Sequence, residues 1–267
     1  MQDRIAAAFQ RLQGKCALAC YVVAGYPDVK ATADIVDALV AGGTDIIELG
    51  IPFSDPIADG PTIQQASHKA LEAGATPEKA LAIARAVRKR YPALPLLAMT
   101  YSNILVRAGM DNFMKRARDC GIDGFILPDL PVEEAADYIA IAKKHGMATV
   151  FLASPNTSDD RLRNIATKSS GFMYLVSVYG ITGARRTFEG YTADAIKRAK
   201  DAAGTKIPVG VGFGISTPAH AKFMIGAGAD AIIVGSAIVD RIARAKNRRA
   251  MLAELRIFAA SLKRACR

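Results

Sequence analysis

Two carboxylates stand close together in the stretch ELGIPFSDPIADGP, residues 48–61. Glu48 lies near the end of an apolar run, 45–50, that has the character of a buried strand, and Asp59 lies in the proline-rich loop that follows. A buried carboxylate must be paired or carry a raised pKa, and a raised pKa suits a group that gives and takes protons. We therefore predict acid–base chemistry at Glu48 and Asp59. The alternatives are an ion pair between Glu48 and a helix, and a turn formed by Asp59.

Two glycine-rich segments form a second motif, PVGVGFGIS at 208–216 and IIVGSAIV at 232–239. Each contains the end of an apolar strand, and the second leads into a helix that starts at Ser236. Glycine lets backbone N–H groups approach an anion closely, and a helix N-terminus adds its dipole. The two segments together predict a phosphate site.

A third segment, VYGITGARRTFEG at 178–190, is rich in glycine and arginine and has no apolar periodicity. Its length and its place after a strand favour a lid that closes over a substrate. An ordinary surface loop is the alternative.

A repeated pattern shows which elements must position these motifs. AGGTDIIELG (41–50), CGIDGFILPD (120–129) and AGADAIIVGS (227–236) each carry a glycine, then an aspartate, then an apolar strand. Helices that end at glycine and pass at once into apolar strands are typical of a parallel sheet covered by helices. The predicted strands are 17–24, 45–50, 95–101, 124–129, 148–154, 172–177, 207–212 and 230–235.

Eight such units predict an α/β fold, the (β/α)8 TIM barrel, as a single domain over residues 1–267. We expect an extra N-terminal helix at 2–14 that closes the barrel bottom. We also expect an extra helix in the second βα unit, where 61–91 holds two helical pieces split at 74–77. An open doubly wound sheet is the alternative, but no G-x-G-x-x-G follows the first strand. Active sites of barrels lie at the carboxyl ends of the strands, where all three motifs fall.

The charge is uneven along the chain, which has a formal net charge of +10. Residues 241–267 carry +8 of it, and the first 240 residues carry only +2. The same tail has one apolar helical stripe, so a solvated basic face is favoured over nucleic-acid binding. That stripe consists of Met251, Leu255, Phe258 and Leu262.

Composition excludes several other classes of protein. Four cysteines at irregular spacing do not form a disulfide framework, and the three histidines give no zinc motif, so no metal is expected. The chain has no signal-peptide pattern and no apolar run near the roughly 18 residues of a membrane span. A cytoplasmic protein that does not bind membranes is therefore expected.

Taken together, the motifs resemble one family over essentially the whole chain, that of the tryptophan synthase α subunit. ELGIPFSDPIADGP is the most specific of them, and AAAFQRL, YVVAGYPD, PDLPVEE (128–134), VSVYGITGAR (176–185), GVGFGIS and GSAIV also fit. The resemblance implies retro-aldol cleavage of indole-3-glycerol phosphate to indole and glyceraldehyde 3-phosphate in tryptophan biosynthesis. It also implies that indole passes to a β subunit, which holds pyridoxal phosphate, in an α2β2 assembly, with no cofactor in this chain.

The resemblance assigns residues as well. Glu48 matches the acid–base residue, and Asp59 matches the anion that stabilises the indole ring at its N–H. The phosphate contacts map to Gly183, Phe213, Gly214, Gly235 and Ser236. The residues expected around the rest of the substrate are Tyr21, Ile63, Tyr101, Ile126, Tyr174, Thr182 and Ile233. The residues expected to face the β subunit are Asp55, Asn103 and Asp129. Tyr21 departs from the phenylalanine often found in the family, and its hydroxyl needs a partner.

Other functions remain open at this point. They are a different phosphate-binding barrel such as a sugar-phosphate isomerase, a free-standing indole-3-glycerol-phosphate lyase without a β partner, and a non-catalytic subunit that only activates a partner. The intact pair of Glu48 and Asp59 argues against the last.

Overall fold

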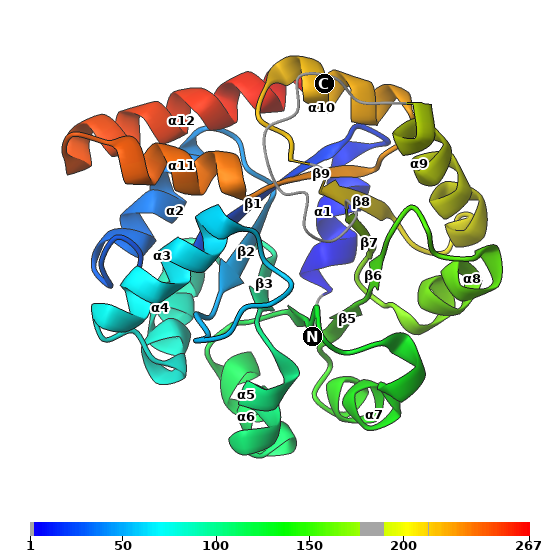
Figure 1. Ribbon diagram of the computed structural model, residues 1–267, viewed down its shortest axis with the longest axis horizontal. Helices are drawn as coiled ribbons and strands as arrows, with labels where there is room; N and C mark the ends of the chain where they lie inside the picture. The colour runs from blue at the N-terminus through cyan, green and yellow to red at the C-terminus, as the bar shows by residue number, and fades with distance from the viewer. Residues whose placement is uncertain (1–2, 177–189, 213) are drawn as a thin grey trace.

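The computed structural model describes residues 3–176, 190–212 and 214–267, and its strands form the predicted barrel (Figure 1). All pairings are parallel, in the order β5-β4-β3-β2-β1-β9-β8-β7-β6. The two end strands, β5 and β6, belong to one extended segment interrupted only at Phe151, so the ring closes through the chain itself. The strands are β1 Ala17–Val23, β2 Ile46–Gly50, β3 Leu96–Met99, β4 Gly124–Ile126, β5 Ala148–Val150, β6 Leu152–Ala153, β7 Met173–Val176, β8 Val209–Gly212 and β9 Ala231–Val234.

Helices surround the strands on the outside of the barrel (Figure 1). The two predicted pieces of 61–91 are confirmed as α3 and α4, while a second helix after β3, α6, was not predicted. The helices are α1 Arg4–Leu12, α2 Ala31–Ala41, α3 Pro61–Glu72, α4 Pro77–Arg90, α5 Ser102–Arg107, α6 Met110–Asp119, α7 Ala136–Lys144, α8 Asp159–Lys168, α9 Gly190–Ala203, α10 Pro218–Gly226, α11 Ser236–Arg244 and α12 Arg248–Ala265, with a 3-10 turn at Val132–Glu134.

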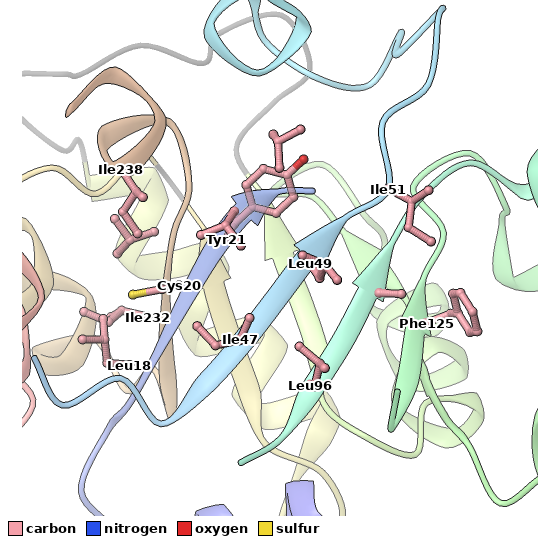
Figure 2. Close-up of a cluster of buried hydrophobic side chains, with 14 of the residues drawn as sticks. Leu18, Cys20, Tyr21, Ile47, Leu49, Ile51, Leu96, Phe125, Ile232 and Ile238 are labelled. Carbon is pink, nitrogen blue, oxygen red and sulfur yellow. The ribbon is translucent and has the colours of Figure 1, made fainter. Parts of the chain in front are cut away.

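Side chains alternate between the inside and the outside of the barrel, as the two-residue period of a strand requires. Figure 2 shows part of the outer layer, in which Leu18, Ile47 and Leu96 pack beneath the helices. The inner layer is a separate apolar cluster that includes Ala19, Ile46, Leu97, Ile126, Val150, Phe172 and Ile233. Ile5 of α1 joins this inner cluster and is buried, so the N-terminal helix does close the barrel bottom.

The aspartate of the repeated glycine–aspartate–strand pattern has the same structural role in all three copies. Asp45, Asp123 and Asp230 stand just before β2, β4 and β9, and each accepts the N–H of the first or second residue of a neighbouring strand. The donors are Leu18 at 2.7 Å, Leu96 at 2.8 Å and Val209 at 2.7 Å, respectively. These N–H groups begin their strands at the barrel bottom, where an unpaired buried donor would be costly.

Each of these aspartates is also held by a cation from a covering helix. Lys263 of α12 bonds Asp45 at 2.5 Å, and Lys200 of α9 bonds Asp230 at 2.6 Å. Asp123 is bonded at 2.7 Å by both Arg4 and Arg88. The glycine–aspartate pattern therefore ties the bottom of the sheet to the surrounding helices and leaves the opposite face free for a site.

The basic C-terminal segment is the predicted amphipathic helix, α12, which packs on α2. All four residues of its apolar stripe are buried. Some of its charges pair within the fold: Arg248 bonds Asp34 at 2.6 Å, and Arg241 in the preceding helix lies 3.5 Å from the centre of the Phe258 ring. The stripe predicted from the sequence is confirmed.

Candidate active site

A cavity of about 660 Å³ opens at the carboxyl ends of the strands, where the sequence motifs were expected to meet. It runs from the barrel interior, past the loop that follows β2, to the beginning of α11. Its inner walls are Tyr21, Met99, Leu152, Tyr174, Val176 and Ile233, and its outer walls include Asp59, Ile63, Gly214, Gly235 and Ser236. Three glycine-rich or carboxylate-bearing segments far apart in sequence thus form one site.

Glu48 lies inside the barrel, on the same face of β2 as the core residue Ile46. It is 0% exposed, and neither of its carboxylate oxygens has a hydrogen-bond partner among the described residues. Burial raises the pKa of Glu48 to about 8, so the side chain is largely neutral at pH 7. The ion pair considered as an alternative is absent from the described part of the chain. A dry, unpaired carboxyl group of this kind can exchange protons near neutral pH.

Asp59 lies at the cavity wall and is held from behind by Tyr101. The Tyr101 hydroxyl donates to Asp59 Oδ2 at 3.0 Å and accepts the Ala58 N–H at 3.0 Å. Burial raises the pKa of Asp59 to about 6, and the hydrogen bond from Tyr101 opposes this rise. Asp59 is therefore mostly ionised at pH 7, while Glu48 is mostly protonated. Two carboxyl groups in such different states are suited to separate acid and anion roles.

The side chain of Gln64 fixes the same loop from the first turn of α3. Its Nε2 donates to the backbone oxygens of Asp59 at 2.9 Å and Pro56 at 3.3 Å. The loop between β2 and α3 is thus closed on itself around the aspartate. Gln64 was not among the site residues predicted from the sequence, because a side-chain bond to a loop carbonyl leaves no sequence pattern.

The outer end of the cavity has the geometry expected of an anion site. Helix α11 starts at Ser236, directly after Gly235, and both residues line the cavity together with Gly214. Gly214 has a φ of +65°, in the left-handed region that favours glycine. A Cβ atom at Gly235 would have its nearest neighbours in Tyr21 and Ile63, at ordinary contact distances of 3.4–3.5 Å, so the position is not closed off by the barrel.

The predicted substrate residues divide into three groups. Tyr21, Ile63, Tyr174 and Ile233 line the cavity. Tyr101 stands behind Asp59, with its ring 5.1 Å from that of Phe53. Ile126 is 0% exposed in the inner core, and its register partner in β3, Met99, lines the cavity instead. Thr182, Gly183 and Phe213 lie outside the described residues, and so does the expected lid at 178–190 apart from Gly190, the first residue of α9.

The three residues expected to face a partner are exposed on neighbouring segments of the same face. Asp55 lies on the loop after β2, Asn103 in α5, and Asp129 after β4. Both oxygens of Asp129 accept the Ser102 N–H, at 2.9 and 3.0 Å, which joins the last two segments. Two large apolar side chains are exposed on these segments, Ile57 at 82% and Val106 at 65%.

Several cavity residues beyond the start of α11 were missed by the sequence analysis. Asp240, Arg241 and Arg244 extend from α11 and Thr62 from α3, and the Thr62 hydroxyl donates to Asp240 at 3.3 Å. The basic tail had been considered only as a surface. Its first residues reach the cavity because α11 starts there and its polar side chains follow at helical spacing.

Within residues 3–176, 190–212 and 214–267, three or more His, Cys, Asp or Glu side chains do not gather as a metal site would require. In the same part of the chain, each helix is too short or too polar to cross a membrane.

The fold and the site together define an enzyme of the (β/α)8 class with two carboxyl groups of raised pKa beside an open helix N-terminus. The family model for the tryptophan synthase alpha chain matches residues 8–267. The chain belongs to the tryptophan synthase alpha chain family. The reaction of this family is the cleavage of indole-3-glycerol phosphate to indole and glyceraldehyde 3-phosphate, so the chain is a carbon–carbon lyase of tryptophan biosynthesis.

Individual relatives cover nearly the whole chain. The tryptophan synthase alpha chain of Methanoregula boonei is 43% identical over 266 residues, 99% of this chain and 99% of that protein. The structure of the alpha subunit from Legionella pneumophila has a TM-score of 0.91 at 33% identity and covers 100% of this chain and 99% of that chain. A tryptophan synthase complex from Pyrococcus furiosus has a TM-score of 0.84 at 40% identity and covers 94% of this chain and 98% of that chain.

Proposed function

We propose that this chain cleaves indole-3-glycerol phosphate with Glu48 as the acid–base group and Asp59 as the ring-stabilising anion. The observation that carries the proposal is the state of Glu48, a fully buried carboxyl group without a partner in the described structure and with a pKa raised to about 8. Such a group is costly to the fold, which supports a catalytic rather than a structural reason for its presence.

Glu48 supplies both proton transfers in turn. The neutral carboxyl group first protonates C3 of the indole ring, which leaves a positive charge on the ring and a carboxylate at Glu48. The carboxylate then takes the proton of the glycerol hydroxyl, the oxygen forms the aldehyde, and the electron pair of the breaking carbon–carbon bond returns to the ring. Glu48 is neutral again, and the products are indole and glyceraldehyde 3-phosphate.

Asp59 stabilises the intermediate between these two steps. Its ionised carboxylate accepts the ring N–H, which becomes more acidic when C3 is protonated, so the interaction is strongest near the transition state. Tyr101 and Gln64 hold Asp59 and its loop in place. The phosphate group would lie above α11, where the backbone N–H groups of Gly235 and Ser236 and the helix dipole favour a dianion. We also propose Gly183, Phe213 and Thr182 as substrate contacts, and for these three residues the proposal rests on the sequence alone.

The face around Asp55, Asn103 and Asp129 is proposed to bind a β subunit, in an α2β2 assembly. The exposed Ile57 and Val106 on the same segments support this, since large exposed apolar side chains beside polar ones are typical of interfaces. The Pyrococcus furiosus neighbour is a tryptophan synthase complex. We propose that the partner holds the pyridoxal phosphate, that this chain works as one domain without a cofactor, and that the assembly is cytoplasmic.

A single assay tests the function. Purified chain is mixed with indole-3-glycerol phosphate, and indole release is measured with and without a tryptophan synthase β subunit. Release in either condition is expected, with a rise of about 10–100-fold in the complex, an energy of roughly 1.4–2.7 kcal/mol. A high rate that does not change on addition of β would support the free-standing lyase instead. Absence of indole in both conditions would contradict the proposal.

A further inference from the structure

The Tyr21 side chain covers Glu48 from the side of the cavity mouth. Tyr21 and Glu48 are register partners on β1 and β2, so their side chains leave the two strands at the same level and on the same face. Figure 2 shows Tyr21 at the carboxyl end of β1. Its hydroxyl lies next to the backbone of Gly50, two residues beyond Glu48. The space is free only because Gly50 has no side chain, since a Cβ atom at that position would lie 2.2 Å from Tyr21 Oη. The hydroxyl is therefore one residue layer above the proposed acid–base group.

The hydroxyl of Tyr21 faces the cavity and has no partner in the described part of the chain. Tyr21 is 6% exposed and lines the cavity, yet its Oη makes no hydrogen bond to any described residue. Two other tyrosines near the barrel do have partners: Tyr138 donates to the Phe125 oxygen at 3.0 Å, and Tyr101 donates to Asp59. A hydroxyl that faces a cavity and has no partner within the protein is available to a polar group of a bound ligand.

The groups around the Tyr21 hydroxyl indicate which part of a bound substrate it contacts. Burial raises the pKa of Tyr21, and the charges of Asp59, Tyr101 and Glu48 raise it further, so both carboxyl groups lie near this side chain. In the proposed function Asp59 takes the indole N–H, and the start of α11 takes the phosphate. The polar groups of the substrate that remain are the glycerol hydroxyls, which must lie beside Glu48.

We propose that the Tyr21 hydroxyl forms a hydrogen bond with the glycerol chain of the substrate and so presents the reacting hydroxyl to Glu48. The Tyr21 ring would pack against the indole ring of the substrate, whereas its hydroxyl would bind the glycerol chain. This inference rests on the proposed function and deepens it, because it gives the site a specific contact for a hydroxylated three-carbon chain.

The reverse reaction tests the inference, because it separates the two halves of the substrate. Wild type and Tyr21→Phe are compared in the condensation of indole with glyceraldehyde 3-phosphate. The KM for the aldehyde phosphate should rise about three- to tenfold, the effect of losing one neutral hydrogen bond, with the KM for indole unchanged. Tyr138→Phe is the matched control: it loses a buried tyrosine hydrogen bond outside the barrel and should leave both constants at wild-type values.

Each other outcome overturns the inference. Unchanged constants in Tyr21→Phe would show that the hydroxyl contacts no substrate. A rise in the KM for indole alone would place the hydroxyl on the ring. A shifted pH profile with unchanged constants would show that it acts through Glu48 or Asp59. A wild-type protein that neither makes nor cleaves indole-3-glycerol phosphate would refute the proposed function itself, and the inference with it.

Discussion

The Tyr101 hydroxyl lies 3.0 Å from Asp59 Oδ2 and donates a hydrogen bond to it, while accepting one from the Ala58 N–H at 3.0 Å. One side chain from the end of β3 thus fixes both the position and the charge of a carboxylate on the loop after β2. Burial and this hydrogen bond act in opposite directions on the pKa of Asp59, which is about 6.

Tyr101→Phe should raise the pKa of Asp59 above about 6, because burial then acts without the opposing hydrogen bond. The acid limb of the rate profile should move up by about one pH unit, the effect of one hydrogen bond to a charged group. Tyr91→Phe is the control, since Tyr91 bonds Asp37 at 2.9 Å away from the cavity. An unmoved acid limb in Tyr101→Phe would show that Asp59 does not control that limb.

The wild-type rate of indole release should be bell-shaped in pH. Asp59 must be ionised to stabilise the ring, so kcat/KM should rise through about pH 6. Glu48 must carry a proton to begin the reaction, so the rate should fall as the pH passes about 8. Steady-state rates from pH 5 to 9.5 check both limbs. A rate that keeps rising above pH 8 would contradict the neutral form of Glu48 as the starting state.

Glu48 should also weaken the fold as the pH rises. The pKa of Glu48 is about 8 in the folded protein against an ordinary 4.5, so between these values the unfolded chain releases a proton that the folded chain keeps. The free energy of unfolding should therefore fall through this window, by about 1.4 kcal/mol per pH unit at most, and be unaffected by this group below it. Urea unfolding of wild type and Glu48→Gln at pH 5 and pH 8 tests this, with the variant gaining on wild type at pH 8. An equal stability difference at both pH values would show that Glu48 does not titrate as described.

Gly235→Asp should raise the KM for indole-3-glycerol phosphate at least tenfold, because one like charge near the phosphate costs more than about 1.4 kcal/mol in a partly buried site. A side chain at this position meets its neighbours at 3.4 Å or more and the φ is −117°, so the backbone accepts it. Gly235→Asn has the same shape without the charge and serves as the control. If both variants showed the same KM, steric filling rather than charge would be responsible, and the phosphate would not lie there.

The fold was predictable because its signals are local. Glycine, aspartate and an apolar run mark the entry to three strands, and the split of 61–91 at 74–77 marks two helices. The break at Phe151 and the division of the segment after β3 into α5 and α6 were not predicted, since an interruption of one residue and the six-residue helix α5 give little periodicity. The role of Asp45, Asp123 and Asp230 was also hidden, because their hydrogen bonds join strands that are neighbours in space rather than in sequence.

The site was predictable where a residue type has an unusual setting, as with Glu48 in an apolar strand. Residues that act through geometry could not be found in this way. Tyr101 was expected in the indole slot and stands behind Asp59, and Ile126 lies in the core while Met99 lines the cavity. A strand pattern shows on which face a side chain lies but not at which depth, and depth separates a core residue from a cavity residue.

The most direct test of the account is indole release by Glu48→Gln. Glutamine keeps the shape of the side chain and cannot shuttle protons, so the rate should fall by about 10²–10⁴-fold or more. Circular dichroism and competition by glycerol phosphate should show that the fold and the phosphate site are intact. Indole release at a rate close to wild type in that variant would contradict the assignment of Glu48 as the acid–base group.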